Sequence, residues 1–279
     1  MTPWTDRADR FSPLKAAFFL GCFLPGLWLA YMLWQDALGP KPITVAIHET
    51  GDWAVRFLLL SLAVTPFRHI LDWTKLIQVR RMLGVTVLAY AAIHLTLYVV
   101  DQKYDLGKVA SEIVLRFYLT IGFVALLALI ALGATSTDAA VKRLKRNWTR
   151  LHMLVYPIGV LAVLHFFLQS KLDVTEPTVM GGLFLLLMLY RVLHARRIRL
   201  TPLAAALAAL AGGLITAALE FAWYGIATGV DPWLILAANL DFSFVVAPAW
   251  WVLGIGLAVA AAAFARRLLP SRKRARAAA

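Results

Sequence analysis

The chain has very little cysteine: Cys22 is the only one in 279 residues. A single thiol excludes an internal disulfide framework. Within one chain it also excludes a zinc site made of several cysteines and an iron–sulfur cluster. No C-x-x-C-H sequence is present, so covalently attached c-type haem is excluded as well.

Nucleotide-binding motifs are also lacking. No P-loop sequence occurs in the chain. The one G-x-G sequence, at 254–256, has no third glycine and lies inside an apolar run. The chain therefore has no recognisable nucleotide-binding domain.

Hydrophobic residues, by contrast, are abundant. They make up 61% of the chain, and the mean hydropathy is +0.75, whereas ordinary soluble domains are about 45–50% apolar. The excess lies in continuous runs of about 18–25 residues, rich in Leu and Ala, with few charges. This pattern excludes a soluble enzyme and a disordered chain. It predicts an all-α fold, a polytopic transmembrane helix bundle.

Eight apolar runs are each close to the ~20 residues that cross the hydrocarbon core as a helix. They cover 14–34, 53–69, 82–100, 116–134, 151–169, 177–194, 201–226 and 242–265. The stretch 232–240 is interpreted as an interfacial lead-in to the last run. The composition changes after Arg199, so we expect one transmembrane module at 1–200 and an appendage of two helices with a basic tail at 201–279.

The distribution of charge predicts the orientation. Most of the 28 basic residues lie in alternate connecting segments, at 7–15, 68–81, 142–150, 191–199 and 266–276. This asymmetry is the positive-inside signal. It predicts a multi-pass protein of the inner membrane with both termini in the cytoplasm. Because topology accounts for the formal charge of +13, nucleic-acid binding is not expected.

Histidines inside the spans are the main chemical signal. His94 lies deep in the third span and His165 in the outer half of the fifth, and ionisable groups in lipid are costly. Counted at about 1.5 Å per residue from the basic inner ends, both lie ~20 Å from the cytoplasmic rim. Two histidines at equal depth suit axial ligation of one haem iron. The alternative is a pair of neutral histidines hydrogen-bonded to neighbouring helices.

His152 begins the fifth span, about 20 Å below His165. At that depth it suits only a second haem on the cytoplasmic side, with His69 as a possible partner. On an ideal helix the side chains of His152 and His165 point about 140° apart. Pro157 lies between them and could kink the helix. The alternative for His152 is an interfacial histidine that reaches water.

Two arginines lie at the outer ends of their spans. Arg56 and Arg116 have the guanidinium geometry that pairs with carboxylates such as haem propionates. The alternative for each is a side chain that reaches the interface beside the hydrocarbon. We name both as candidate cofactor-binding residues.

Three segments carry a family resemblance. HETGDWAVRFLLLSLAVTPFR (48–68), RRMLGVTVLAYAAIHLTLYVV (80–100) and NWTRLHMLVYPIGVLAVLHFF (147–167) closely resemble the MsrQ (YedZ) family. The inner loop TSTDAAVKRLKRNW (135–148) is similar as well. The resemblance covers about residues 10–200, and it places the chain among ferric-reductase-like membrane cytochromes.

The resemblance implies cofactors, partners and site residues. It implies b-type haem, one or two per chain, and FMN. It also implies electron transfer from the quinone pool, or from a cytoplasmic flavin reductase, to the periplasmic molybdopterin subunit MsrP, which repairs methionine sulfoxide. The family's haem histidines fall on His94, His152 and His165. No FMN residue is carried over. Family members commonly end after the sixth span, so the last two helices depart from the pattern.

Two alternatives remain at this point. One is another ferric- or quinone-reductase-like cytochrome. The other is a transporter whose histidines are structural, although paired deep histidines without buried acidic partners fit a transporter poorly. In the favoured interpretation the chain is an electron-transfer subunit, and the catalytic reduction of sulfoxide takes place on a separate subunit.

Overall fold

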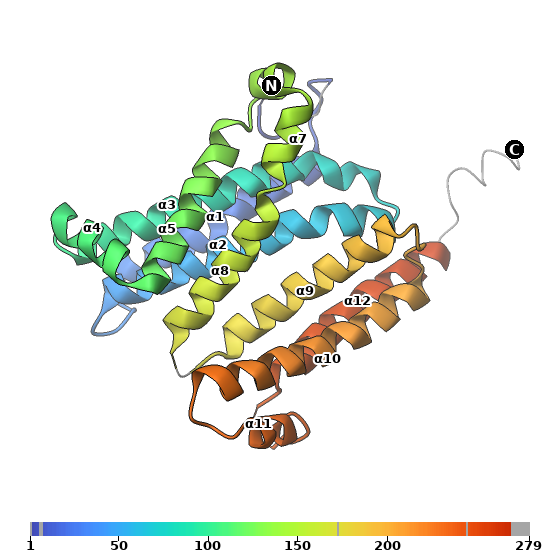
Figure 1. Ribbon diagram of the computed structural model, residues 1–279. Coiled ribbons are helices and arrows are strands. Elements are labelled where there is room, and N and C mark those ends of the chain that lie inside the picture. The colour runs from blue at the N-terminus through green and yellow to red at the C-terminus, as the bar shows by residue number, and fades with distance from the viewer. Residues whose placement is uncertain (1, 6–7, 172, 244, 269–279) are drawn as a thin grey trace, which may run out of the picture. The chain divides into compact units, whose positions relative to one another are not determined.

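The computed structural model describes residues 2–5, 8–171, 173–243 and 245–268, and helices dominate this part of the chain (Figure 1). Contacts divide it into two compact units. The first unit comprises Met1–Leu62 and Gln78–Lys171, and the second comprises Ala63–Ile77 and Leu172–Ala279. Arg7 and the basic residues after Leu268, which were expected on the cytoplasmic side, lie outside the described residues.

Among the helices of the first unit, the long ones contain most of each expected apolar run. The helices of this unit are α1 (Pro13–Trp34), α2 (Pro42–Ile70, which ends in the second unit), α3 (Arg80–Asp101), α4 (Leu106–Leu115), α5 (Phe117–Ala134), α6 (Asp138–Leu144), α7 (Arg146–His152) and α8 (Val155–Ser170). A 3₁₀ turn, η1 (Thr74–Val79), precedes α3. Helix α5 packs against α8, α3 and α4.

Local chemistry explains several helix ends. Ser12 accepts a hydrogen bond from the Lys15 amide at the start of α1, and Asp105 accepts one from the Lys108 amide at the start of α4; both are N-caps. Arg116 adopts an extended backbone (φ −104°, ψ 104°), which separates α4 from α5. Helix α4 was not expected from the sequence, because its ten residues are too few to span a membrane.

The second unit contains α9 (Thr175–Ala195), α10 (Pro202–Ala227), α11 (Pro232–Ala238) and α12 (Pro248–Leu268). Helices α9, α10 and α12 pack against one another. The packing boundary therefore lies near residue 172, because α9 joins the two added helices. The expected functional division at residue 200 stays a prediction.

Small residues allow the close packing in the second unit. A Cβ atom on Gly256 of α12 would lie 2.5 Å from the Cβ of Ala209 on α10. The short helix α11, expected as an interfacial lead-in, is tied to this bundle by polar contacts. Asn239, at its C-terminal end, donates a hydrogen bond to the buried carboxyl of Glu220 at 3.1 Å, and its carbonyl accepts one from the Trp250 indole at 2.6 Å.

The polytopic all-α fold is confirmed. In the described residues, seven segments are long and apolar enough to cross a membrane. The remaining expected span, 53–69, which is the second in chain order, lies within α2, where Arg56 and Arg68 interrupt the apolar stretch. Its crossing of the membrane, and with it the orientation of the termini, stays a prediction.

Candidate functional site

The two deep histidines face the same cavity of the first unit. Their ring centres lie 6.3 Å apart and the ring planes are perpendicular, at 90°. Two imidazoles that bind one metal ion from opposite sides, with metal–nitrogen bonds of about 2.0 Å, have ring centres roughly 6.3 Å apart. The spacing of His94 and His165 therefore fits two imidazoles that would hold one metal ion between them.

Hydrogen bonds define the tautomer of both rings. Nδ1 of His94 lies 2.7 Å from the carbonyl oxygen of Ile47, and Nδ1 of His165 lies 2.7 Å from that of Tyr118. A carbonyl oxygen can only accept, so Nδ1 carries the proton in each ring and the lone pair of the neutral imidazole lies on Nε2. Among the described residues, neither Nε2 atom has a hydrogen-bond partner. This is the arrangement of a histidine prepared for metal ligation.

The cavity has a volume of about 550 Å³, within the range of roughly 300–1,000 Å³ for ligand sites. Its walls come from α2, α3, α4, α5 and α8, and they are apolar near the histidines, where Val55, Leu58 and Leu126 line it. Such walls suit a flat apolar macrocycle. The donor set and the lining therefore fit a non-covalently held haem.

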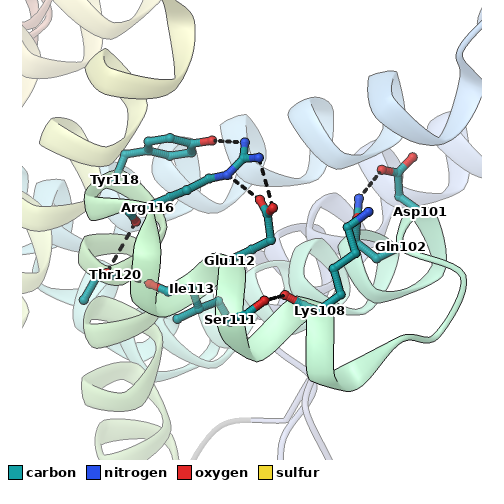
Figure 2. Close-up of polar contacts among 9 residues, drawn as sticks. All are labelled: Asp101, Gln102, Lys108, Ser111, Glu112, Ile113, Arg116, Tyr118 and Thr120. Atoms are coloured by element: carbon teal, nitrogen blue, oxygen red, sulfur yellow. Dashed lines mark hydrogen bonds and ion pairs between the residues drawn. The ribbon is translucent and has the colours of Figure 1, made fainter.

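Polar residues gather toward one end of this cavity. Arg116 forms a bidentate ion pair with Glu112, and its Nη1 donates a hydrogen bond to the Tyr118 hydroxyl at 3.1 Å (Figure 2). The hydrogen bond to the Tyr118 hydroxyl is the largest cause that raises the pKa of Arg116 above its usual value, and the charge of Glu112 raises it further. Arg116 can meet a carboxylate of a bound group.

Sequence reasoning missed two further cations in the lining. Lys108 of α4 and Lys171, which follows α8, also border the cavity.

The break between α4 and α5 is stabilised by the Thr120 hydroxyl, which donates a hydrogen bond to the Ile113 carbonyl at 2.6 Å (Figure 2). A short amphipathic stretch between two spans, here 106–115, was the available signal for this part of the site.

The other candidates lie outside the cavity lining. The Arg56 guanidinium lies 4.9 Å from the centre of the Trp53 ring. His152 stacks on Trp148 with ring centres 3.9 Å apart, and its Nε2 lies 3.2 Å from the Thr135 hydroxyl. In the second unit, His69 stacks on His194 at 4.4 Å. His152 therefore does not line the cavity of His94 and His165, and its role as the ligand of a separate haem stays a prediction.

Known proteins resemble the chain over this region. Residues 50–163 match the model of the ferric reductase like transmembrane component family. These residues include His94, His152 and most of the cavity walls, and they end just before His165. No solved structure matches the chain.

Curated relatives extend the match. The "Protein-methionine-sulfoxide reductase heme-binding subunit MsrQ" of Xanthomonas campestris pv. campestris (strain B100) is 48% identical over 193 residues, 66% of this chain and 88% of the relative. The protein of the same name from Rhodospirillum rubrum is 40% identical over 201 residues, 71% of this chain and 97% of the relative. At this identity and coverage, the chain belongs to the MsrQ family of ferric-reductase-like membrane proteins.

Proposed function

We propose that this chain binds b-type haem between His94 and His165 and transfers electrons across the inner membrane to a periplasmic methionine sulfoxide reductase. The observation that carries the proposal is the matched pair of rings. Each holds its Nδ1 proton on a backbone carbonyl, and their centres are 6.3 Å apart at the edge of one cavity. The relatives' name, haem-binding subunit, supports it.

The chain's own residues do three things in this proposal. His94 and His165 would hold the haem iron through their Nε2 atoms, and two protein ligands would disfavour the binding of oxygen. The apolar walls hold the macrocycle and exclude water, while Arg116 and the two lysines meet its carboxylates. Haem, when bound, supplies one-electron chemistry that the side chains cannot. The protein sets its reduction potential through ligand basicity and the polarity of the walls.

The partners and further cofactors belong to the same proposal. We infer that the electrons come from the quinone pool or from a cytoplasmic flavin reductase, and that the acceptor is the molybdopterin subunit MsrP. FMN is a second candidate cofactor, and His152 is a candidate ligand of a second haem. For that role, the His152 ring would have to leave the Thr135 hydroxyl.

Absorption spectroscopy of the purified protein tests the haem. A shift of the Soret and α bands between the oxidised and dithionite-reduced protein, with the spectrum of a six-coordinate low-spin iron, is the expected result. A pyridine haemochrome assay identifies non-covalent b-type haem. A purified, folded protein without a redox-sensitive Soret band would contradict the proposal and favour the alternative of a transporter with structural histidines.

A further inference from the structure

The two histidine rings share a local arrangement that extends beyond the hydrogen bonds. Each acceptor carbonyl lies 47 residues before its histidine, on a neighbouring helix. One helical turn after each acceptor, on the same face, stands a glycine: Gly51 follows Ile47, and Gly122 follows Tyr118. The two sequences around these glycines, IHETG and YLTIG, have little else in common.

Each ring occupies the space that a side chain would need. A Cβ atom on Gly51 would lie 3.0 Å from Nδ1 and 3.1 Å from Cε1 of His94. On Gly122 it would lie 2.8 Å from Cε1, 2.9 Å from Nδ1 and 3.1 Å from Nε2 of His165. Non-bonded carbon atoms prefer separations of about 3.5–4.0 Å. Any residue other than glycine would therefore displace the ring.

The displacement would act on the Nδ1 hydrogen bond of the ring. Each ring is held on one side by a 2.7 Å hydrogen bond to the carbonyl one turn away. A methyl group in place of the glycine hydrogen would push the ring away from that carbonyl, because both lie on the same helix face. Without this hydrogen bond, neither the tautomer of the ring nor the direction of its Nε2 atom would be fixed. Gly182, Gly212 and Gly256 of the second unit differ from this pair, since a Cβ there would meet aliphatic or hydroxyl side chains of a packed helix.

We infer that Gly51 and Gly122 are positioning residues: each provides the notch in which one imidazole lies against the neighbouring helix, with Nδ1 on the carbonyl and Nε2 directed to the cavity. The role of the two glycines in haem binding rests on the proposed function. Their role in allowing the Nδ1 hydrogen bond does not depend on any bound group. We expect the larger effect from a substitution at Gly122, because a Cβ there would lie closer to the ring and would also meet Nε2.

The test compares Gly51→Ala and Gly122→Ala with the control Gly84→Ala. Gly84 lies on α3, as His94 does, and a Cβ there would meet only the Ser61 hydroxyl oxygen, at 3.9 Å. The first measurement is ¹⁵N NMR of histidine-labelled protein prepared without haem. The Nδ1-protonated signal of one ring should disappear in each test variant and persist in the control. The second measurement is haem affinity, which should fall about tenfold or more, the usual cost of disturbing the partner of a metal-bound histidine.

A double-mutant cycle separates the notch from ordinary helix packing. In a His165→Ala background the ring is gone, so Gly122→Ala should no longer lower the thermal stability. An equal loss of stability in both backgrounds would mean that Gly122 serves helix packing, and the inference would be wrong. Test variants with unchanged NMR signals and unchanged haem affinity would also overturn it. Wild-type protein that binds no haem would instead contradict the proposed function. The NMR comparison would still show whether the two glycines position the histidine rings.

Discussion

At the scale of single residues, His94 and His165 are expected to act as one unit. If they share an iron, the loss of either ring by substitution with Ala should remove the low-spin spectrum of the same haem. The double variant should be little worse than either single one, because the second ring cannot hold a six-coordinate iron alone. Soret absorbance and a pyridine haemochrome assay on purified protein measure this. Two single variants with full haem and an unchanged spectrum would rule out a shared iron.

His152→Ala provides the matched control for these variants. Its ring lies between Trp148 and the Thr135 hydroxyl, outside the cavity lining. We expect the substitution to leave the haem held by His94 and His165 intact. If instead it removes a separate fraction of the haem, His152 ligates a second one, and titration of the reduction potential would resolve two components in the wild-type protein.

The two arginine candidates are expected to differ. Arg116 lines the cavity, whereas Arg56 lies over the Trp53 ring and outside the lining. Arg116→Gln should weaken haem retention by roughly two- to fivefold, the range for exposed charge pairs. Arg56→Gln should leave it near the wild-type value. Haem transfer to apomyoglobin measures retention, and the reverse order of the two effects would assign the carboxylate contact to Arg56.

At the scale of helices, hydropathy was sufficient to predict most of the fold. The expected run 116–134 differs from α5 by one residue, and 82–100 lies inside α3, because lipid requires continuous apolar helices. The same signal missed α4, which is too short to span, and it placed the start of the last span six residues before α12. In those places capping and backbone geometry determine where a helix begins and ends, and neither produces an apolar pattern in the sequence.

The site was predicted in part from the sequence. Equal depth brought His94 and His165 together as a hypothesis, and the structure does place them at one cavity. The carbonyls of Ile47 and Tyr118 could not be foreseen, since any residue carries that group. Gly51 also looked ordinary, because a glycine matters here only through a ring on another helix.

Packing within the second unit gives a prediction about α12. Gly256 and Gly254 lie on the same helix, but a Cβ would reach Ala209 from Gly256 and nothing within 4 Å from Gly254. Gly256→Ala should therefore lower the unfolding free energy by roughly 1–3 kcal/mol through overpacking. Gly254→Ala should be neutral or slightly stabilising. Thermal unfolding in detergent compares the two, and equal midpoints would contradict the tight contact of α10 with α12. Neither variant should change the haem spectrum, since the lining of the cavity lies within residues 44–171.

At the scale of the whole molecule, the number of spans decides the side on which the chain ends. Seven helices qualify in the described residues, and α2 would make an eighth. Eight crossings place both termini in the cytoplasm, where the basic segments favour them. A phosphatase fused after Ala279 should then be inactive, whereas a fluorescent protein at the same point should fold. A fusion at residue 40, before α2, should give the opposite result. Periplasmic phosphatase activity from the C-terminal fusion would show that α2 does not cross.

At the same scale, the proposed function predicts the direction of electron flow. In that proposal the haem binds at the cavity of His94 and His165, and methionine sulfoxide is reduced on a separate molybdopterin subunit. We therefore expect the reduced chain to pass its electrons to that subunit at the periplasmic rim.

The corresponding experiment is stopped-flow absorbance of the reduced protein under strict exclusion of oxygen. Addition of the molybdopterin subunit with methionine sulfoxide should reoxidise the haem much faster than methionine sulfoxide alone. His165→Ala, which should lack the six-coordinate haem, provides the control for direct reduction of the partner by residual dithionite. Equal reoxidation rates with and without the partner would favour an independent ferric- or quinone-reductase-like cytochrome. The polar end of the cavity, at α4 and the start of α5, predicts where the partner docks. Lys103 is exposed between α3 and α4 and lies outside the cavity lining. A variant with altered charge at Lys103 should slow the reaction with the partner more than it changes the spectrum, because surface charge governs the encounter of the two proteins.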